Sequence, residues 1–286
     1  MAHTTPPPEQ WSEQVFGQAE LGDRRRTQRL VKIGAMLASH TGDSALAASE
    51  GDSALSEGAY RLFRNDAVDT NAIAKSGFAA TAKSVTDYAE LLAVEDTTTL
   101  AYTHTATKEL GDMGGKAGSK NRGFHVHSVL LVAQQTECTV GLIAQQRWCR
   151  DRAKRGQRNQ NKYRAYEDKE SYKWQNASEQ MTQRLGDNMS RLISVCDREA
   201  DVYEYLMYKI EARQRYIVRA CHDRRLDDEK ENLFANVAQT ESLGQHTLKI
   251  AQRGGVHGRT ARDVRLTLHS QSATLHRPER KGGHKA

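Results

Sequence analysis

The chain lacks the features that mark a membrane, secreted or disulfide-rich protein. No run of about eighteen apolar residues occurs, which is the length that a membrane-spanning helix needs. The first residues have neither the basic start nor the apolar centre of a signal peptide. Cysteine is scarce, and its copies are widely separated, with no pair at zinc-finger or redox spacing: Cys138, Cys149, Cys196 and Cys221. We therefore expect a cytoplasmic protein with reduced thiols, and neither a disulfide framework nor a structural zinc site.

The composition is that of a soluble globular protein with surplus positive charge. The 286 residues suffice for two modest domains or one large one, and 37% of them are hydrophobic. The net charge of +6 fits a polyanionic partner such as nucleic acid without proving it. Basic residues gather between Arg147 and Arg164, where Asp151 is the only acid, and again from Arg253 onward. We interpret both runs as solvated segments until other features point to DNA.

The amino-terminal part reads as a small helical domain behind a disordered, proline-rich leader. We place the leader at residues 1–10 and the helical domain at 11–70. Residues 13–37 have helical spacing, and Asp23 is a plausible N-cap for the second of two helices. The sequence Gly-Asp-Ser-Ala-Leu at 42–46 recurs at 51–55, which we interpret as two turns that each start a helix.

The helix after Asp23 carries a basic face. Arg25, Arg29 and Lys32 follow one another at i, i+4 and i+7, so they share one side of the helix. Leu30, Ile33 and Leu37 can pack inward. Such a face can neutralise phosphates, and arginine can also contact guanine edges in the major groove. The alternative is an ordinary solvated helix face.

The rest of the chain alternates strands and helices, which predicts a mixed sheet covered by helices and hence an α/β fold. Beyond residue 233, short alternating runs suggest further strands. The expected elements are a helix at 72–92 leading into a strand at 91–99, a Gly-rich loop at 111–123, strands at 126–133 and 139–144, a helix at 172–188, a strand at 192–197, a helix at 202–213, a strand at 215–221, and β-segments at 264–269 and 273–276.

Two aspartates end apolar, β-branched runs. Asp96 follows Leu-Leu-Ala-Val-Glu, and Asp197 follows Leu-Ile-Ser-Val-Cys. Carboxylates on adjacent strands can hold Mg²⁺, which prefers hard oxygen ligands and serves phosphoryl transfer in two-metal sites. An aspartate in such a place can equally cap a helix or start a turn.

Several other polar residues near these strands are weaker candidates for metal ligands. Glu199 and Asp201 are better explained as acids that start a helix or lie behind the metal ligands than as ligands themselves. His125 and His127 alternate along a strand, so we expect one of them to pack inward, and neither has an identifiable metal-binding partner.

Six motifs are distributed along the chain. They are Leu-Gly-Asp at 21–23 with Arg-Arg-Thr at 25–27, Glu-Gly-Ala-Tyr-Arg-Leu-Phe-Arg-Asn at 57–65, Leu-Leu-Ala-Val-Glu-Asp-Thr-Thr-Thr-Leu at 91–100, Arg-Gly-Phe-His-Val-His-Ser-Val-Leu-Leu at 122–131, Glu-Asp-Lys-Glu-Ser at 167–171 with Lys-Trp at 173–174, and Val-Cys-Asp-Arg-Glu-Ala-Asp at 195–201. Together they resemble the bacterial cut-and-paste DDE transposases of the transposon-five type, in the insertion-sequence-four group. The resemblance covers residues 11–275.

The resemblance implies a function and a set of site residues. Asp96 and Asp197 would be the first two metal-binding acids of a DDE triad, held on a ribonuclease-H-like fold with Mg²⁺ as the ion. The family nicks the transposon end with water, forms and opens a hairpin, and joins the end to target DNA as a dimer. The helical domain would contact the terminal repeat through Arg25, Arg26, Arg29 and Arg61, while Lys120 and Arg122 are plausible phosphate contacts.

The chain departs from the family beyond its second acid. The family's third acid lies in a Tyr, Arg, Glu, Lys signature that has no counterpart here, and Glu279 is no substitute because no helix holds it. We therefore expect a truncated protein: an incomplete ribonuclease-H-like domain at 71–225 and a partial inserted β-region with a basic tail at 226–286. Cleavage by this chain alone is expected to be weak or absent.

Three functions follow from this departure. The first is a DDE transposase, with DNA and a second copy of the chain as partners. The second is a catalytically inactive DNA-binding remnant, which could pair with and inhibit an intact transposase. The third is a nuclease that uses a local third acid such as Glu199.

Overall fold

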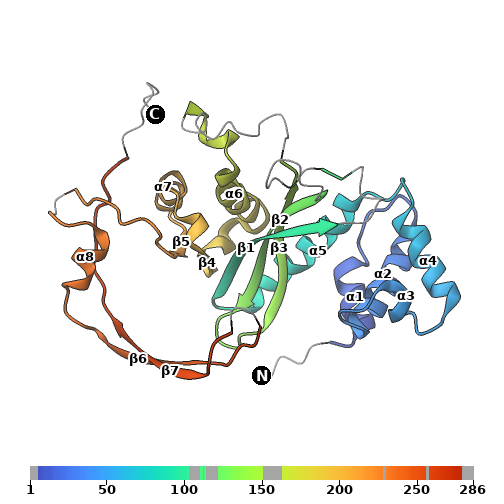
Figure 1. Cartoon of the computed structure of the whole chain (residues 1–286). Coiled ribbons are helices and arrows are strands. Elements are labelled where there is room, and N and C mark those ends of the chain that lie inside the picture. The colour runs from blue at the N-terminus through green and yellow to red at the C-terminus, as the bar shows by residue number, and fades with distance from the viewer. Residues whose placement is uncertain are drawn as a thin grey trace. The chain divides into compact units, whose positions relative to one another are not determined.

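The computed structural model describes residues 6–102, 110–111, 113, 122–150, 163–227, 230–255 and 258–278 (Figure 1). The chain divides into two compact units between Arg219 and Ala220. Among the described helices, none combines the length and the apolar character that a membrane-spanning segment requires. The three-part division expected from the sequence stays a prediction.

The amino-terminal region is helical, as predicted. Asp23 caps the second helix, because its Oδ1 accepts a hydrogen bond of 2.8 Å from the backbone N–H of Arg25. Ser44 and Asp52 cap the next two helices, so the repeated Gly-Asp-Ser-Ala-Leu segments do start helices. The first helix begins at Pro8, inside the segment predicted as a disordered leader, since proline is well tolerated in a first helical turn. The four helices are α1 (Pro8–Phe16), α2 (Arg24–Ser39), α3 (Ala45–Ala48) and α4 (Ser53–Phe63).

Helices α1 and α2 approach each other closely at Gly34. A Cβ atom at this position would lie 2.4 Å from Ser12 Oγ and 3.1 Å from the Phe16 ring. The Ser12 hydroxyl is buried and donates a hydrogen bond of 2.7 Å to the carbonyl of Val31. The inward residues of α2, Leu30 and Ile33, are buried as predicted. The glycine therefore sets the distance between the two helices.

The central element is a five-stranded mixed sheet with the order β3-β2-β1-β4-β5. Strand β1 pairs antiparallel with β2 and parallel with β4; β2 pairs antiparallel with β3, and β4 parallel with β5. This confirms the predicted mixed sheet. The strands are β1 (Leu91–Tyr102), β2 (Arg122–Ala133), β3 (Thr139–Trp148), β4 (Leu192–Cys196) and β5 (Arg215–Val218).

Two predicted boundaries in this region were wrong. The helix expected at 72–92 is α5 (Thr70–Ser84), followed by a 3₁₀ turn, and Leu91 already pairs with both β2 and β4. Pairing on two sides outweighs the local helical preference there. The strand expected at 215–221 ends at Val218, where its pairing with β4 ends. Most of the predicted Gly-rich loop lies outside the described residues.

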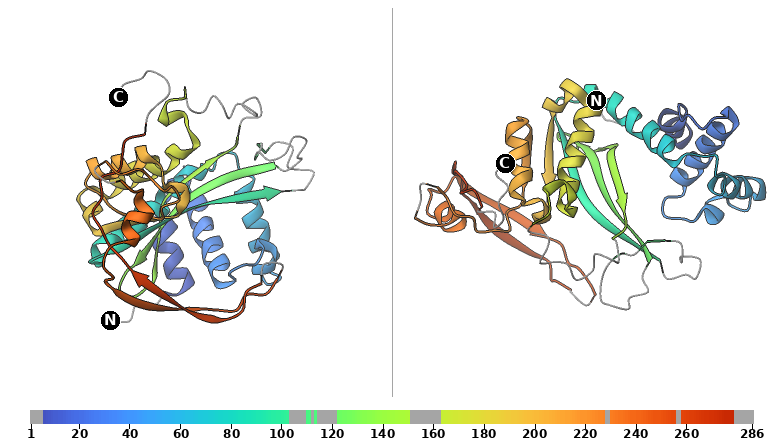
Figure 2. Two further views of the ribbon diagram at one scale, coloured as in Figure 1. Left: turned by 60° about the vertical axis from the view of Figure 1, so that its left-hand side comes forward. Right: turned by 90° about the horizontal axis from the view of Figure 1, so that it is seen from above.

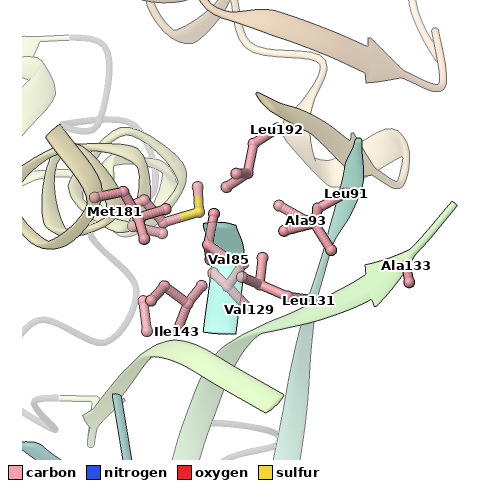
Figure 3. Close-up of a cluster of buried hydrophobic side chains, with 12 residues drawn as sticks. Val85, Leu91, Ala93, Val129, Leu131, Ala133, Ile143, Met181 and Leu192 are labelled. Carbon is pink, nitrogen blue, oxygen red and sulfur yellow. The ribbon is translucent and has the colours of Figure 1, made fainter. Parts of the chain in front are cut away.

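Helices α6 (Lys173–Leu185) and α7 (Tyr203–Glu211) cover one face of the sheet (Figures 1 and 2). Met181 of α6 packs there against Leu131 and Ile143, and Tyr205 of α7 packs against Trp174 (Figure 3 shows the first of these clusters). These side chains are almost completely buried. The covered face is therefore the core of the unit.

The opposite face of the sheet is more open. Leu92 and Val132 are half-buried, while Val94 and Leu142 are each 38% exposed. The alternation along β1 follows from the two-residue period of a strand, which sends successive side chains to opposite faces. Side chains at odd-numbered positions of β1 near residue 95 thus point into the core, and side chains at even-numbered positions face outward.

The second unit contains a short helix and a two-stranded antiparallel ribbon. Helix α8 (Leu233–Ala238) begins the segment for which the sequence suggested only further strands, because a short apolar run does not distinguish helix from strand by its period. The ribbon consists of β6 (Gly244–Ile250) and β7 (Arg262–Leu268). The β-segment expected at 273–276 is reduced to one bridge, between Leu275 and Leu226.

Candidate metal and DNA-binding sites

Asp96 lies within β1, and Asp197 directly follows the neighbouring strand β4. The pairing between β1 and β4 ends at Glu95 and Cys196. Asp96 and Asp197 are the next residues along the chain after this pair. Neighbouring strands are about 4.8 Å apart, so the two backbones are close at this level. Both aspartates are exposed, and Asp96 projects from the face of β1 opposite to the buried Glu95. The two strands that carry or precede these acids are adjacent, as expected.

Local hydrogen bonds hold each carboxylate. Asp96 Oδ1 accepts from the backbone N–H of Thr97 at 2.7 Å. Asp197 Oδ1 accepts from the N–H of Glu199 at 2.8 Å and thereby caps the 3₁₀ turn Arg198–Ala200. Among the described residues, the other oxygen of each carboxylate has no hydrogen bond, so it can accept a further ligand. In the described part of the chain, the two aspartates do not join a third Asp, Glu, His or Cys ligand in a cluster within 4.8 Å.

Glu199 stands beside this pair but is engaged with a lysine. Its Oε2 lies 3.1 Å from Nζ of Lys173, whose side chain is only 9% exposed. The same ammonium lies 5.7 Å from the ring centroid of Trp148 and 5.4 Å from that of Trp174. Cation–π and ionic contacts together fix this lysine near Asp197. Glu199 is in the first turn of a helix, as the sequence indicated.

Directly behind Asp96, on the covered face, lies a buried carboxylate. Glu95 is 2% exposed, and its Oε2 lies 3.5 Å from Nε2 of His127, with both side chains fully buried. The separation is long for a hydrogen bond, and within the described residues neither of these atoms has a hydrogen-bond partner. The prediction that only one of His125 and His127 packs inward was wrong: both are buried, because residues two apart on a strand share a face.

The buried cluster around Glu95 includes an amine, a thiol and a phenol. Lys209 Nζ donates to Ser194 Oγ and to Gln214 Oε1, each at 2.9 Å. Burial lowers the pKa of Lys209, although the charge of Glu95 opposes this. Burial, and after it the charge of Glu95, raises the pKa of both Cys196 and Tyr205. At neutral pH the thiol and the phenol are therefore protonated.

The predicted DNA-contacting arginines fall into two groups. The side chains of Arg25 and Arg29 are exposed on α2, and that of Arg61 is exposed on α4. Arg61 Nε donates to Glu57 Oε1 at 2.9 Å, an exposed pair one helical turn apart that contributes little stability and yields readily to another anion. Arg29 crosses to α4, where a Cβ atom added to Gly58 would lie 3.6 Å from its guanidinium. These three cations belong to two packed helices.

Arg26 differs from its neighbours. Its Nη1 donates to the carbonyl of Leu21 at 2.9 Å and to the carbonyl of Ala67 at 3.1 Å, so it connects the start of α2 with the segment after α4. The side chain is half-buried. A role in DNA contact stays a prediction, and it would use the guanidinium nitrogens that these carbonyls leave available.

The remaining predicted cations are partly outside the described structure. Lys120 lies outside the described residues. Arg122 is half-buried at the start of β2, opposite Tyr102 of β1. In the basic run that begins at Arg147, Arg150 forms a two-point contact with Glu170 at 2.7 and 2.8 Å. This hydrogen bonding raises the pKa of Arg150.

Sequence reasoning missed the support around Asp96. Thr97 Oγ1 lies 3.0 Å from Nδ1 of His127, and the His127 ring meets the Trp174 ring edge-on at 4.6 Å. The available signal was the two-residue period, which places Glu95 and Thr97 on one face and Asp96 on the other.

A comparison with known families identifies the helical region. Residues 8–68 match the family described as "Transposase DNA-binding". The match begins at the first residue of α1 and continues beyond α4 to the segment that contains Ala67, which Arg26 holds. This match supports a transposase that binds DNA.

Proposed function

We propose that this chain is a DNA transposase of the DDE type, which binds transposon terminal repeats and catalyses metal-dependent strand cleavage and transfer, with activity impaired because the third acid of the triad has no counterpart in its sequence. One observation carries the proposal: a transposase DNA-binding match over 8–68 occurs in the same chain as two exposed aspartates on neighbouring parallel strands. DNA binding alone would not require the aspartate pair. The mixed sheet, with its element order as predicted, supports a ribonuclease-H-like fold for this region.

Asp96 and Asp197 are the residues that would hold Mg²⁺. Their carboxylates are exposed, hard oxygen donors, and each keeps an oxygen that accepts no backbone hydrogen bond from its own turn. Bound there, divalent ions would activate an attacking oxygen and stabilise a leaving oxygen in phosphoryl transfer. The protein supplies the position: two strands that cannot shift relative to one another without breaking the parallel pairing.

The helical domain supplies affinity for the transposon end. Arg25, Arg29 and Arg61 project from α2 and α4, where they can neutralise phosphates or contact guanine edges. The carboxylate of Asp23 caps the amino end of α2, and no further acid lies in the first turn, so the arginines there keep a net positive surface. We assign these three arginines to the terminal repeat.

The test combines binding and cleavage on one substrate. The full chain is incubated with a duplex taken from the inverted repeats that flank its gene, first without and then with Mg²⁺. Asp197→Ala removes a proposed metal ligand, and Asp187→Ala, an exposed acid elsewhere in unit 1, is the matched control. We expect weak Mg²⁺-dependent cleavage, because the third acid of the triad has no counterpart in the sequence, and we expect Asp197→Ala to abolish it and Asp187→Ala to preserve it.

Two outcomes would contradict parts of the proposal. Retention of the duplex without any cleavage, under all conditions, would refute the enzyme and leave a DNA-binding protein that occupies transposon ends. Cleavage that persists in Asp197→Ala would remove that aspartate from the metal site.

A further inference from the structure

Asp96 is flanked by two residues that point into the core. Glu95 and Thr97 occupy the covered face of β1, while Asp96 projects from the open face between them. One side chain on the neighbouring strand reaches both: His127 Nδ1 lies 3.0 Å from Thr97 Oγ1, and its Nε2 lies 3.5 Å from Glu95 Oε2. On the covered face, the imidazole of His127 therefore connects the residues immediately before and after Asp96.

The imidazole itself has little freedom. His127 is fully buried, and its ring packs edge-on against Trp174, which is 1% exposed. Its strand partner is Thr97, so the antiparallel ladder fixes the distance between the two backbones. A close-packed interior transmits a displacement of one of these groups to the next.

Stability alone does not account for this arrangement. Both carboxylate oxygens of Glu95 and the Nε2 of His127 are buried, and in the described part of the structure none has a partner at ordinary hydrogen-bond geometry; the thiol of Cys196 offers Glu95 only a weak donor. Burying polar groups without such partners costs free energy, so an apolar pair of similar size would stabilise the core more. Incompletely paired, buried polar groups of this kind are characteristic of functional sites.

We propose that Glu95, Thr97 and His127 form a positioning unit that fixes the backbone of β1 at Asp96, and thereby holds the Asp96 carboxylate ready for a divalent cation. The link to the carboxylate is direct, because the N–H of Thr97 donates to Asp96 Oδ1 at 2.7 Å. This inference rests on the proposed metal site. According to this inference, Glu95, Thr97 and His127 increase the affinity of the site for the metal without contacting the metal.

The chain contains a matched control for this unit. Two residues further along the same strands, Thr99 Oγ1 lies 3.1 Å from Nδ1 of His125. His125 is also buried, at 5% exposure, and also packs near a tryptophan, Trp148, with ring centroids 5.5 Å apart. The two Thr–His pairs thus share residue types, strands and face. They differ in their distance from Asp96 and in the second contact of the histidine, which is Glu95 for His127 and the carbonyl of Met113, at 3.2 Å, for His125.

The experiment measures Mn²⁺ binding to the full chain by electron paramagnetic resonance, which detects the free ion and needs no turnover. Thr97→Val removes the hydroxyl and keeps the shape; Thr97→Ser restores the hydroxyl; Thr99→Val is the control. The double variant Asp96→Asn, Asp197→Asn defines the baseline of unrelated binding. We expect Thr97→Val to weaken the aspartate-dependent binding about 10-fold, as removal of groups behind metal ligands commonly does. Thr97→Ser and Thr99→Val are expected to bind as the wild type does.

The outcomes separate this inference from the proposed function. If the double aspartate variant binds Mn²⁺ as well as the wild type, the metal site is wrong, and the inference falls with it. If the aspartates are required but Thr97→Val and Thr99→Val both bind like the wild type, the positioning unit is refuted while the metal site stands. Circular dichroism verifies folding, and Thr97→Ala with Thr99→Ala replaces the valine pair if either valine variant does not fold.

Discussion

Arg25 and Arg26 are consecutive on α2, yet the structure gives them different tasks, and replacing each by alanine separates those tasks. The Arg25 side chain is exposed, and only its backbone N–H takes part in the cap of the helix. The Arg26 guanidinium donates to the carbonyls of Leu21 and Ala67. Arg26→Ala should therefore destabilise the helical domain, whereas Arg25→Ala should weaken DNA binding and leave stability unchanged.

The magnitude follows from the two hydrogen bonds. A hydrogen bond from a charged group contributes about 1.5 to 3 kcal/mol when buried. Arg26 is half-buried, and its contact with Ala67 is exposed, so water can replace part of what is lost. We expect Arg26→Ala to cost about 1–2 kcal/mol, which raises the population of open states roughly 5- to 30-fold. Arg25→Ala should stay within about 0.5 kcal/mol of the wild type.

Hydrogen exchange measures the first effect where it arises. Amide exchange of peptides from α2 and α4 in the full chain reports the local opening of these helices. Fluorescence anisotropy with the terminal-repeat duplex, at several salt concentrations, measures the second. Loss of one phosphate contact in Arg25→Ala should reduce the slope of log K against log salt by about 0.9.

The reasoning would be refuted by the reverse pattern. If Arg26→Ala exchanges like the wild type and lowers the salt slope as Arg25→Ala does, the two carbonyl contacts do not stabilise the domain, and Arg26 serves the DNA.

Three further predictions concern packing and charge. Gly34→Ala should cost about 1–3 kcal/mol, because the new Cβ would lie 2.4 Å from Ser12 Oγ; urea unfolding measures it, and an unchanged midpoint would contradict it. Burial alone would raise the pKa of Glu170, but the hydrogen bond from Arg150 lowers this pKa below its ordinary value of 4.5. The wild type should therefore be more stable than Glu170→Gln above pH 4.5, and this advantage should disappear as the pH falls through the pKa of Glu170 in the folded protein. Burial lowers the pKa of Lys209 below its ordinary value of 10.5. The stability of the wild type relative to Lys209→Met should therefore rise as the pH increases from the pKa of Lys209 in the folded protein towards 10.5. Thermal unfolding at several pH values tests the trends for Glu170 and Lys209, and a stability difference that does not change with pH would contradict the corresponding prediction.

The helical domain was largely predictable because its signals are local. Asp23 precedes a run with helical spacing, and Ser44 and Asp52 stand where capping residues are expected. Boundaries that depend on distant partners were not predictable. Leu91 belongs to a strand because β2 and β4 pair with it, and neither partner is near it in the sequence.

In the candidate site, too, the features with local sequence signals were predictable and those that depend on distant partners were not. The apolar runs before Asp96 and Asp197 predicted two strands, of which β4 ends just before Asp197 while β1 continues past Asp96, but their parallel pairing in register is a tertiary fact. The contacts of Arg26 are equally invisible in the sequence, because Ala67 lies 41 residues away. An arginine in a basic helix looks the same whether it faces DNA or two carbonyls.

Glu95 and Asp96 show most clearly where sequence reasoning ends. The sequence offers two adjacent carboxylates, and the two-residue period of a strand requires them to face opposite sides of the sheet. It does not say which side the helices cover. In the structure α6 and α7 cover the side of Glu95, so that acid meets His127 and stays buried, while Asp96 remains exposed beside Asp197. If the helices covered the other face, the chemical roles of the two acids would be exchanged.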